Sequence, residues 1–411
     1  LSASGQLVTL TLPTLAPGSY RLVIDGDQVS DRAGNTFGSA DQIISTFDIV
    51  EATIEWTAPA GGDWNNPANW DLGRIPDATD VVLINGGLGT TVNINAGNVR
   101  VQGIDSFSDL TLNGASLTVD SFLTVHDAYD LTLNDGVIQR GTITLEGSAN
   151  LMVASGTRNS RLDGVTVVGD IDLVNATLRL KDVAIDGRVS LSNGGYSGYS
   201  TLAFEGTQTL AGNAEIVSNF DGYYNSNYLE MQAAGELTLG ADVRVHGSSL
   251  VLGGSLAFNA SMERLINQGT IEAATGSVQV VADAFTNEGV AEATGGTLYL
   301  SAADNAQTTS GRLRVTSGEL YTSGDWALPG VIETSGGALY LGGTLHTGGF
   351  AGFVSTGGVV NFTGTVENSG STLTLGAMPG DWVLNGTIHG GTLQIDAGES
   401  LMVASGTRNS R

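Results

Sequence analysis

The chain has 411 residues, of which 41% are hydrophobic and 14% charged, so it can bury a core and is not a disordered linker. It has no cysteine, which excludes a disulfide framework, a thiolate metal site and a cysteine nucleophile. The net charge of −26 would repel phosphate, and no apolar run approaches the roughly 18 residues of a membrane helix. We therefore expect no nucleic-acid partner and no membrane insertion.

Residues 1–50 differ from the rest of the chain. They contain the run LAPGSY (15–20), a turn at Asp31–Gly34–Asn35 and a closing strand-like run at Phe47–Val50. This pattern resembles the C-terminal half of the immunoglobulin-like modules that occur in tandem in large bacterial surface proteins. The resemblance implies a partial β-sandwich module at the N-terminus, of which only about half is present.

One loop of this segment is a candidate calcium site. The run DGDQVSDRAGN (25–35) offers oxygen ligands, which suit a hard cation, from Asp25, Asp27, Asp31 and Asn35. The run lacks the glutamate at the twelfth position that completes an EF-hand, and the glycine-rich nonapeptide of calcium-binding β-rolls is absent from the chain. Asx turns explain the same residues, so calcium binding and a purely local turn are both open. No other cofactor is indicated.

Residues 51–96 concentrate tryptophan. Three of the five tryptophans, Trp56, Trp64 and Trp70, fall within WTAPAGGDWNNPANW. The segment resembles the one that precedes the right-handed parallel β-helix in bacterial autotransporter and filamentous-adhesin passenger domains. We expect these rings to cover the open end of the first coil. The alternative is a platform that stacks on sugar rings.

Residues 97–411 repeat with a period near 20. LINQGTIEAATGSVQV (265–280) aligns without a gap on FTNEGVAEATGGTLYL (285–300), and DLTLN recurs at 109–113 and 130–134. Apolar and polar residues alternate within each repeat, and glycine separates the runs. The sequence therefore predicts an all-β chain built around a right-handed parallel β-helix, a solenoid of about 20–22 residues per coil.

The alternation also predicts which side chains face inward. Equivalent places in successive repeats are expected to stack in one interior row, and one position earlier, as at Thr297, should face outward. The predicted interior row is Val278, Leu298, Leu320, Leu339, Val360 and Leu393.

A longer repeat is an identity. LMVASGTRNSR occupies 151–161 and again 401–411, which is 250 residues later, and similar residues precede both copies. We interpret this as a duplicated module whose second copy begins near 382–401, so we expect the chain to be a fragment of a much longer protein. Residues 97–411 also resemble the β-helix arrays of very large secreted proteins from environmental bacteria. That resemblance identifies architecture rather than activity.

No catalytic constellation stands out. Acidic residues are scattered singly, the four histidines lie far apart in the sequence, and no zinc, nucleotide or nucleophile motif occurs. Two Gly/Ser/Asn-rich excursions, GGYSGYS and FDGYYNSNY, break the coil period and are candidate contact loops, although long corners would explain them equally. Their tyrosines are Tyr196, Tyr199, Tyr223, Tyr224 and Tyr228.

From these features we expect a non-enzymatic structural or adhesive protein on the bacterial cell surface, a rigid stalk or a fibre subunit. Its expected partners are other copies of itself, adjoining modules and cell-surface glycans. The alternative is a carbohydrate-binding or polysaccharide-degrading β-helix, because solenoids of this kind also host enzymes that act on polysaccharides. A groove lined by aromatic side chains and paired acids would favour that alternative.

Overall fold

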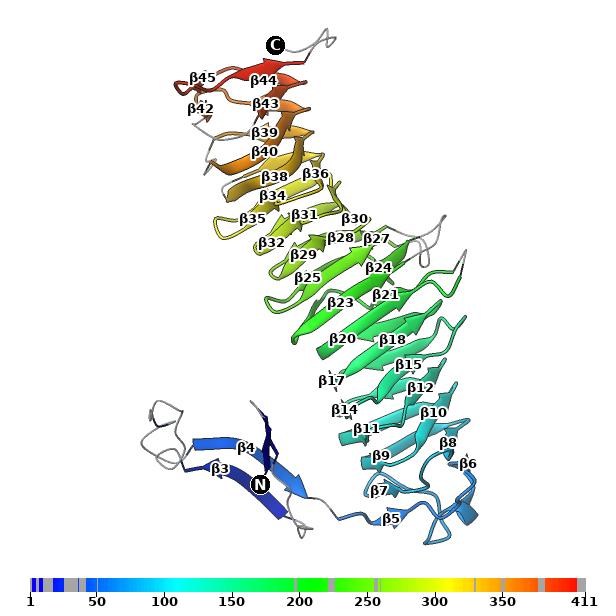
Figure 1. Ribbon diagram of the computed structural model, residues 1–411. Helices are drawn as coiled ribbons and strands as arrows, with labels where there is room; N and C mark the ends of the chain where they lie inside the picture. The colour runs from blue at the N-terminus through cyan, green and yellow to red at the C-terminus, as the bar shows by residue number, and fades with distance from the viewer. Residues whose placement is uncertain are drawn as a thin grey trace.

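The structure is a computed structural model that describes residues 2–4, 7–9, 18–25, 36, 42–49, 51–195, 198–220, 226–254, 258, 260–328, 330–348, 352–375 and 381–404. The chain is 60% strand, and within the described residues helix is limited to one 3-10 turn, Pro67–Asn69. The strands wind into a parallel β-solenoid of about 14 turns (Figure 1). The all-β and parallel solenoid predictions are confirmed.

The N-terminal segment forms short antiparallel pairs. Strand β1 (Ser2–Ser4) pairs with β2 (Leu7–Thr9), and β3 (Gly18–Ile24) pairs with β4 (Gln42–Ile49). Antiparallel pairing distinguishes this segment from the solenoid, in which all strand pairings are parallel among the described residues except for one isolated bridge, Trp56–Trp70.

Each turn of the solenoid contributes one strand to each of three faces, which we name A, B and C in the order the chain visits them. Face A consists of β6 (Gly62–Asp63), β8 (Thr91–Ile94), β10 (Asp109–Asn113), β12 (Leu131–Asn134), β15 (Asn150–Val153), β18 (Asp170–Val174), the later part of β20 (Ala184–Ser192), β23 (Ala214–Asn219), β26 (Arg244–Ser248), β29 (Thr270–Ala273), β32 (Val290–Ala293), β35 (Arg312–Val315), and the early parts of β38 (Val331–Leu341) and β40 (Phe353–Phe362). A separate parallel pair, β42 (Thr372–Leu375) and β45 (Thr392–Ile395), follows near the C-terminal end.

Face B consists of the early parts of β9 (Asn98–Ser106) and β11 (Ser116–Val125), then β13 (Val137–Gln139), β16 (Ser160–Asp163), β19 (Thr177–Lys181), β21 (Thr201–Phe204), β24 (Asn227–Met231), β27 (Leu250–Gly253), β30 (Ser277–Val281), β33 (Thr297–Leu300), β36 (Glu319–Thr322), the later parts of β38 and β40, β43 (Asp381–Leu384) and β46 (Leu401–Val403). Face C consists of β5 (Ile54–Glu55), β7 (Val81–Ile84), the later parts of β9 and β11, β14 (Thr142–Leu145), β17 (Thr166–Val168), the early part of β20, β22 (Gln208–Leu210), β25 (Gly235–Leu239), β28 (Met262–Asn267), β31 (Ala284–Asn287), β34 (Asp304–Gln307), β37 (Asp325–Ala327), β39 (Thr344–His346), β41 (Thr365–Glu367) and β44 (Thr387–His389).

The core is a set of apolar rows, each made of side chains at the same position of successive coils. Strand alternation places one side chain in two inside, and stacking the coils buries what a single coil would expose. The predicted interior row is confirmed from Val278 to Val360, whose members pair in register and are at most 3% exposed. Thr297 lies between two inward positions and is partly exposed.

The prediction for Leu393 is wrong. Val360 pairs with Trp382, whereas Leu393 pairs with Leu373 in the separate β42–β45 pair and is 38% exposed. The phrase around Leu393 matches the earlier repeats, but strand β43 intervenes and takes the next place on face B. A sequence that matches the repeat therefore does not by itself show on which face its strand lies.

Glycine occupies the corners because the coils approach too closely there for any side chain. A Cβ atom on Gly318, where φ is +75°, would lie 2.1 Å from the carbonyl oxygen of Gly296 in the preceding coil. A Cβ atom on Gly337 would lie 2.4 Å from the carbonyl oxygen of Gly318. Gly296, Gly318 and Gly337 thus form a column along which the backbones of successive coils are in close contact.

Candidate functional site

The tryptophan-rich segment is continuous with the solenoid. Strands β5 and β6 pair in parallel with β7 and β8, and β7 continues to β9, so the sheets run across the predicted boundary between residues 96 and 97. Trp56, Trp64 and Trp70 are at most 5% exposed and meet edge to face, with ring centroids 4.8–4.9 Å apart. Because the rings are buried, they offer no open face on which a sugar could stack.

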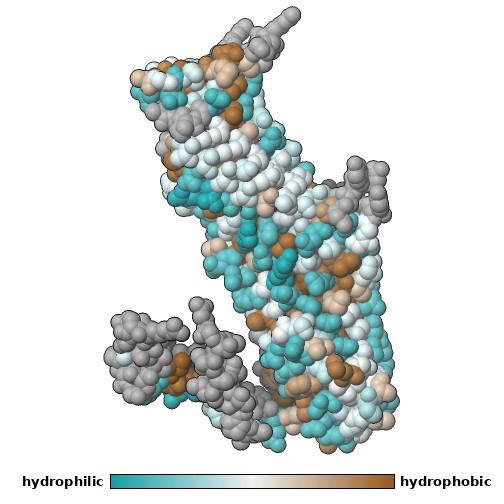
Figure 2. Space-filling model, viewed as in Figure 1, coloured by the Kyte–Doolittle hydropathy of each residue, from teal (hydrophilic) through white to brown (hydrophobic). Residues whose placement is uncertain are grey.

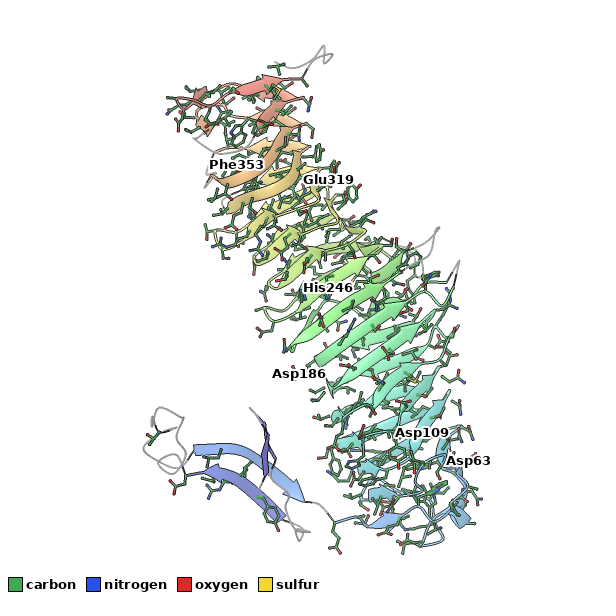
Figure 3. The ribbon with its side chains drawn as sticks, in the orientation of Figure 1. Asp63, Asp109, Asp186, His246, Glu319 and Phe353 are labelled. Atoms are coloured by element: carbon green, nitrogen blue, oxygen red, sulfur yellow. The ribbon has the colours of Figure 1, made fainter. Side chains whose placement is uncertain are left out.

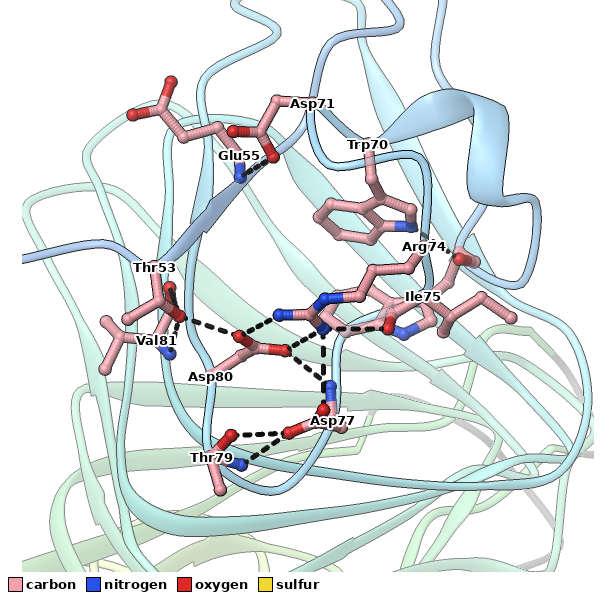
Figure 4. Close-up of polar contacts among 11 residues, drawn as sticks. Thr53, Glu55, Trp70, Asp71, Arg74, Ile75, Asp77, Thr79, Asp80 and Val81 are labelled. Carbon is pink, nitrogen blue, oxygen red and sulfur yellow. Dashed lines mark hydrogen bonds and ion pairs between the residues drawn. The ribbon is translucent and has the colours of Figure 1, made fainter.

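A buried carboxylate holds the same segment in place (Figure 4). Asp80 is 2% exposed and receives both arms of the Arg74 guanidinium, at 2.6 and 2.8 Å. Its oxygens also accept from the Thr53 hydroxyl at 2.9 Å and from the Asp77 backbone N–H at 2.7 Å. The hydrogen bonds from Arg74 outweigh the effect of burial and lower the pKa of Asp80 to about 2. Asp80 therefore has a structural role, because both of its carboxylate oxygens already accept hydrogen bonds.

The candidate calcium loop lies largely outside the described residues. Asp25 directly follows β3, whereas Asp27, Asp31 and Asn35 lie outside the described residues. In the described part of the chain, no group of three histidine, aspartate or glutamate side chains is placed to hold a metal ion. The calcium interpretation stays a prediction.

Two of the five predicted contact tyrosines come together. Tyr196, Tyr223 and Tyr224 lie outside the described residues. Tyr199 and Tyr228 meet edge to face at 5.6 Å, and Tyr228 lies on strand β24 rather than in a loop. Burial raises the pKa of Tyr228.

Arg158 lies beside this tyrosine pair. Its guanidinium donates to the Tyr199 hydroxyl at 3.3 Å and sits 6.0 Å from the centre of the Tyr199 ring. Arg158 and Tyr199 line a cavity of about 150 Å³ together with Gly156, Thr157, Asn175, Ala176 and Thr177. The first of the two period-breaking runs thus contributes Tyr199 to this small cavity, and Tyr228 of the second run contacts Tyr199.

A second tyrosine cluster was not predicted. Tyr299, Tyr321 and Tyr340 form a row on the outer side of face B, with ring centroids 5.1 and 4.3 Å apart and nearly parallel planes. The Tyr321 hydroxyl donates to Glu319 at 3.0 Å, and burial together with Glu319 raises the pKa of Tyr321. The signal in the sequence is a tyrosine at the same place in GTLYL, GELYT and GGALYL. Since the rings cover one another, the row connects coils more than it offers a stacking surface.

Face A carries a row of charged side chains. In successive coils His246, Glu272, Glu292, Arg314 and Glu333 occupy the same outward position, and Figure 3 labels His246 in the middle of the solenoid. The Glu272 and Glu292 side chains are 9% and 8% exposed. These two buried carboxylates therefore lie in adjacent coils.

Both carboxylates are held by neighbours. Glu272 forms an ion pair with Arg244 and accepts from the Thr294 hydroxyl at 2.6 Å, and Arg314 donates to Glu292 at 2.6 Å. Burial alone would raise the pKa of Glu272, but the hydrogen bonds from Thr294 and Arg244 together lower it. The lowered pKa favours the ionised form of Glu272, and both carboxylates are already engaged by arginine.

The histidines follow the same rule. His126 lies between Asp105 at 2.5 Å and Glu146 at 2.7 Å, which come from different coils. His246, His346 and His389 contact Glu215, Asp325 and Glu367 at 2.7–2.8 Å. Sequence separation had suggested isolated histidines, whereas the solenoid pairs each of them with a carboxylate about one coil away.

The visible surface is mixed, with hydrophilic and neutral side chains around scattered apolar ones (Figure 2). No helix in the described residues has the length and apolar character needed to span a membrane. Comparisons with protein-family models, with curated proteins and with solved structures find no match to this chain. The function therefore has to be argued from the geometry of the chain itself.

Proposed function

We propose that the protein is a non-enzymatic extracellular rod that serves as a structural or adhesive element of a bacterial cell surface. The observation that carries this proposal is the use of outward side chains as ladders between coils. Tyrosines stack on tyrosines on face B, and glutamates pair with arginines along face A. Side chains used in this way stiffen a long object, because each coil is fastened to its neighbours.

The location is supported by composition and by resemblance. The chain lacks cysteine and carries a net charge of −26, which keeps it soluble in an exposed setting. Its tryptophan-rich segment resembles that of bacterial autotransporter and filamentous-adhesin passenger domains. We accordingly propose self-association, or contact with adjoining modules of the same protein, as the main interaction.

The second candidate is a carbohydrate-active solenoid. The contact between Arg158, Tyr199 and Tyr228 favours the binding form of that candidate, since cations and aromatic rings both recognise sugars. The degrading form has less support, because Glu272 and Glu292 are already engaged by arginine.

Negative-stain microscopy and a polysaccharide screen test the proposal together. We expect straight rods of uniform width and no release of reducing or unsaturated ends from plant, algal or bacterial polysaccharides above a boiled control, with or without calcium. Turnover that disappears in Glu272→Gln or Glu292→Gln but persists in the partly exposed control Glu288→Gln would establish the enzyme instead.

A further inference from the structure

Face B carries a shallow groove near the N-terminal end of the solenoid. Its volume is about 420 Å³, and it crosses β9, β11, β13 and β16. It is lined by Arg100, Thr118, Gln139, Arg140, Asp163 and Gly164. Arg100, Thr118, Gln139 and Asp163 occupy one outward row, so the groove runs along the solenoid axis.

The groove lies in a basic region of face B, although two carboxylates, Asp120 and Asp163, accompany its own two arginines. Arg100 and Arg140 share one carboxylate, Asp120, at 2.9 and 3.6 Å. Farther along the face, Arg161 and Arg179 share Glu205, at 2.9 and 3.0 Å. Lys181 lies 3.8 Å from Asp163, which also forms an ion pair with Arg161 at 3.1 Å. Five basic side chains thus face three carboxylates.

Arg140 stands out within this group. Its φ is +64°, a left-handed conformation that occurs at the same corner in the next two coils at Gly164 and Asp182. Glycine and aspartate adopt this conformation readily, whereas arginine does so rarely. The Arg140 side chain is 65% exposed, and its one ion pair within the described residues is the 3.6 Å contact with Asp120. Neither packing nor local conformation accounts for an arginine at this corner.

The polar residues between the arginines can serve sugar hydroxyls. The Thr118 hydroxyl donates to the Gln139 amide oxygen at 3.1 Å, and the Gln139 amide nitrogen makes no hydrogen bond within the described residues. Asp163 supplies an acceptor and Gln139 a donor, while the guanidinium forks match planar carboxylates. Alternating hydrogen-bond donors, acceptors and cations suit a polysaccharide that carries both hydroxyl and carboxylate groups.

We propose that this groove binds a uronate-containing polysaccharide, laid along the solenoid axis over Arg100 and Arg140. The inference rests on the proposed adhesive function and gives it a site and a ligand class. The register from Arg100 to Lys181 covers four steps of about 4.8 Å each, long enough for an oligosaccharide rather than a single small anion.

The test is binding of polygalacturonate oligomers, with dextran oligomers as the neutral comparison, by calorimetry in low salt with EDTA. We expect the intact chain to bind the uronate and not the dextran, and added sodium chloride to weaken binding. Arg140→Gly should weaken binding by about tenfold or more, as expected for the loss of a charged contact of about 1.4 kcal/mol. Because glycine suits the corner, this variant should fold as well as the parent.

Arg264→Gln is the matched control. Arg264 lies on face C, is 47% exposed and contacts Glu236 at 3.4 Å, so the same loss of charge occurs far from the groove. Affinity should stay unchanged in that variant. Equal binding by Arg140→Gly and the parent, absence of uronate binding, or preferred binding of oligothymidylate would each overturn the proposal. Straight rods without uronate binding would defeat this site alone, whereas cleavage of polysaccharide would defeat the proposed function.

Discussion

At the scale of single residues, the buried carboxylate of Asp80 is stabilised by a complete set of hydrogen bonds. Asp80 accepts from Arg74 and Asp77, which are close to it in sequence, and from Thr53, which precedes it by 27 residues, so the network joins two parts of the tryptophan-rich segment. An ionised carboxylate with 2% exposure is tolerable only because every acceptor position is used.

The hydrogen bonds to Asp80 should make the free energy of unfolding depend on pH in the acidic range. The pKa of Asp80 falls from 3.8 to about 2 on folding, so its contribution is fully present above the unfolded value and is lost as pH falls toward 2. We expect the free energy of unfolding to fall by about 2 kcal/mol between roughly pH 5 and pH 2. Denaturant unfolding measured across this range should show the loss in the parent. A much weaker dependence is expected in Asp80→Asn, and identical slopes would contradict the assignment.

The interior row should be sensitive to polarity at one position and tolerant at the next. Leu298→Asn places an unpaired amide in the core and should cost about 3–5 kcal/mol. Thr297→Asn, one position earlier and outward, should cost less than about 1 kcal/mol. Asparagine is a better probe than aspartate, because Thr297 pairs with Glu319 and a second carboxylate would add repulsion. Equal losses in urea unfolding would show that the register is wrong.

At the scale of elements, rows of identical residues connect adjacent coils of the solenoid. The tyrosine row on face B depends on ring contact between coils, with the hydroxyl of Tyr321 adding one bond to Glu319. On face C, buried Asn267 donates to Asn287 at 2.8 Å, and Asn287 donates onward to the Arg312 backbone carbonyl at 2.9 Å. These side chains satisfy corner carbonyls that the strands leave unpaired.

The tyrosine row can be separated into stacking and hydrogen bonding. Tyr321→Ala should cost about 1–2 kcal/mol because it removes two ring contacts. Tyr321→Phe keeps the rings and loses only the bond to Glu319, so we expect a cost below about 1 kcal/mol. Thermal unfolding of both variants measures the difference. A larger loss in the phenylalanine variant would assign the effect to the hydroxyl.

At the scale of the whole molecule, the described solenoid should behave as a stiff rod. About 14 turns at roughly 4.8 Å per turn give a length of about 65–70 Å. Small-angle X-ray scattering should return an elongated particle with a core of at least that length, and far-ultraviolet circular dichroism should show strand with negligible helix. A helix content above about a fifth, or a compact particle, would contradict the solenoid.

The duplicated sequence occupies different faces in its two copies. Leu151–Val153 lies in β15 on face A, whereas the identical Leu401–Val403 lies in β46 on face B. The preceding strands shift in the same way, from β12 on face A to β43 on face B. The same residues can therefore form a strand on face A or on face B.

The sequence by itself determined the kind of coil. Alternation chose strand over helix, and glycine at corners such as Gly318 is needed because the neighbouring backbone leaves no room for a Cβ atom. These are local properties, so they can be read without knowing the partners. The in-register interior from Val278 to Val360 followed from the same signals.

The tertiary structure decided which coils meet at each position. The displacement of Leu393, the tyrosine row and the groove at Arg100 and Arg140 depend on how many residues each coil contains. The strands of face B stay about one coil apart, whereas the phrase around Leu393 lies in the separate β42–β45 pair. The partner of a side chain on the stack is therefore about 20 residues away instead of adjacent. Local sequence patterns determine whether a segment forms a strand. Which strands lie beside it depends on the number of residues in all the coils between them.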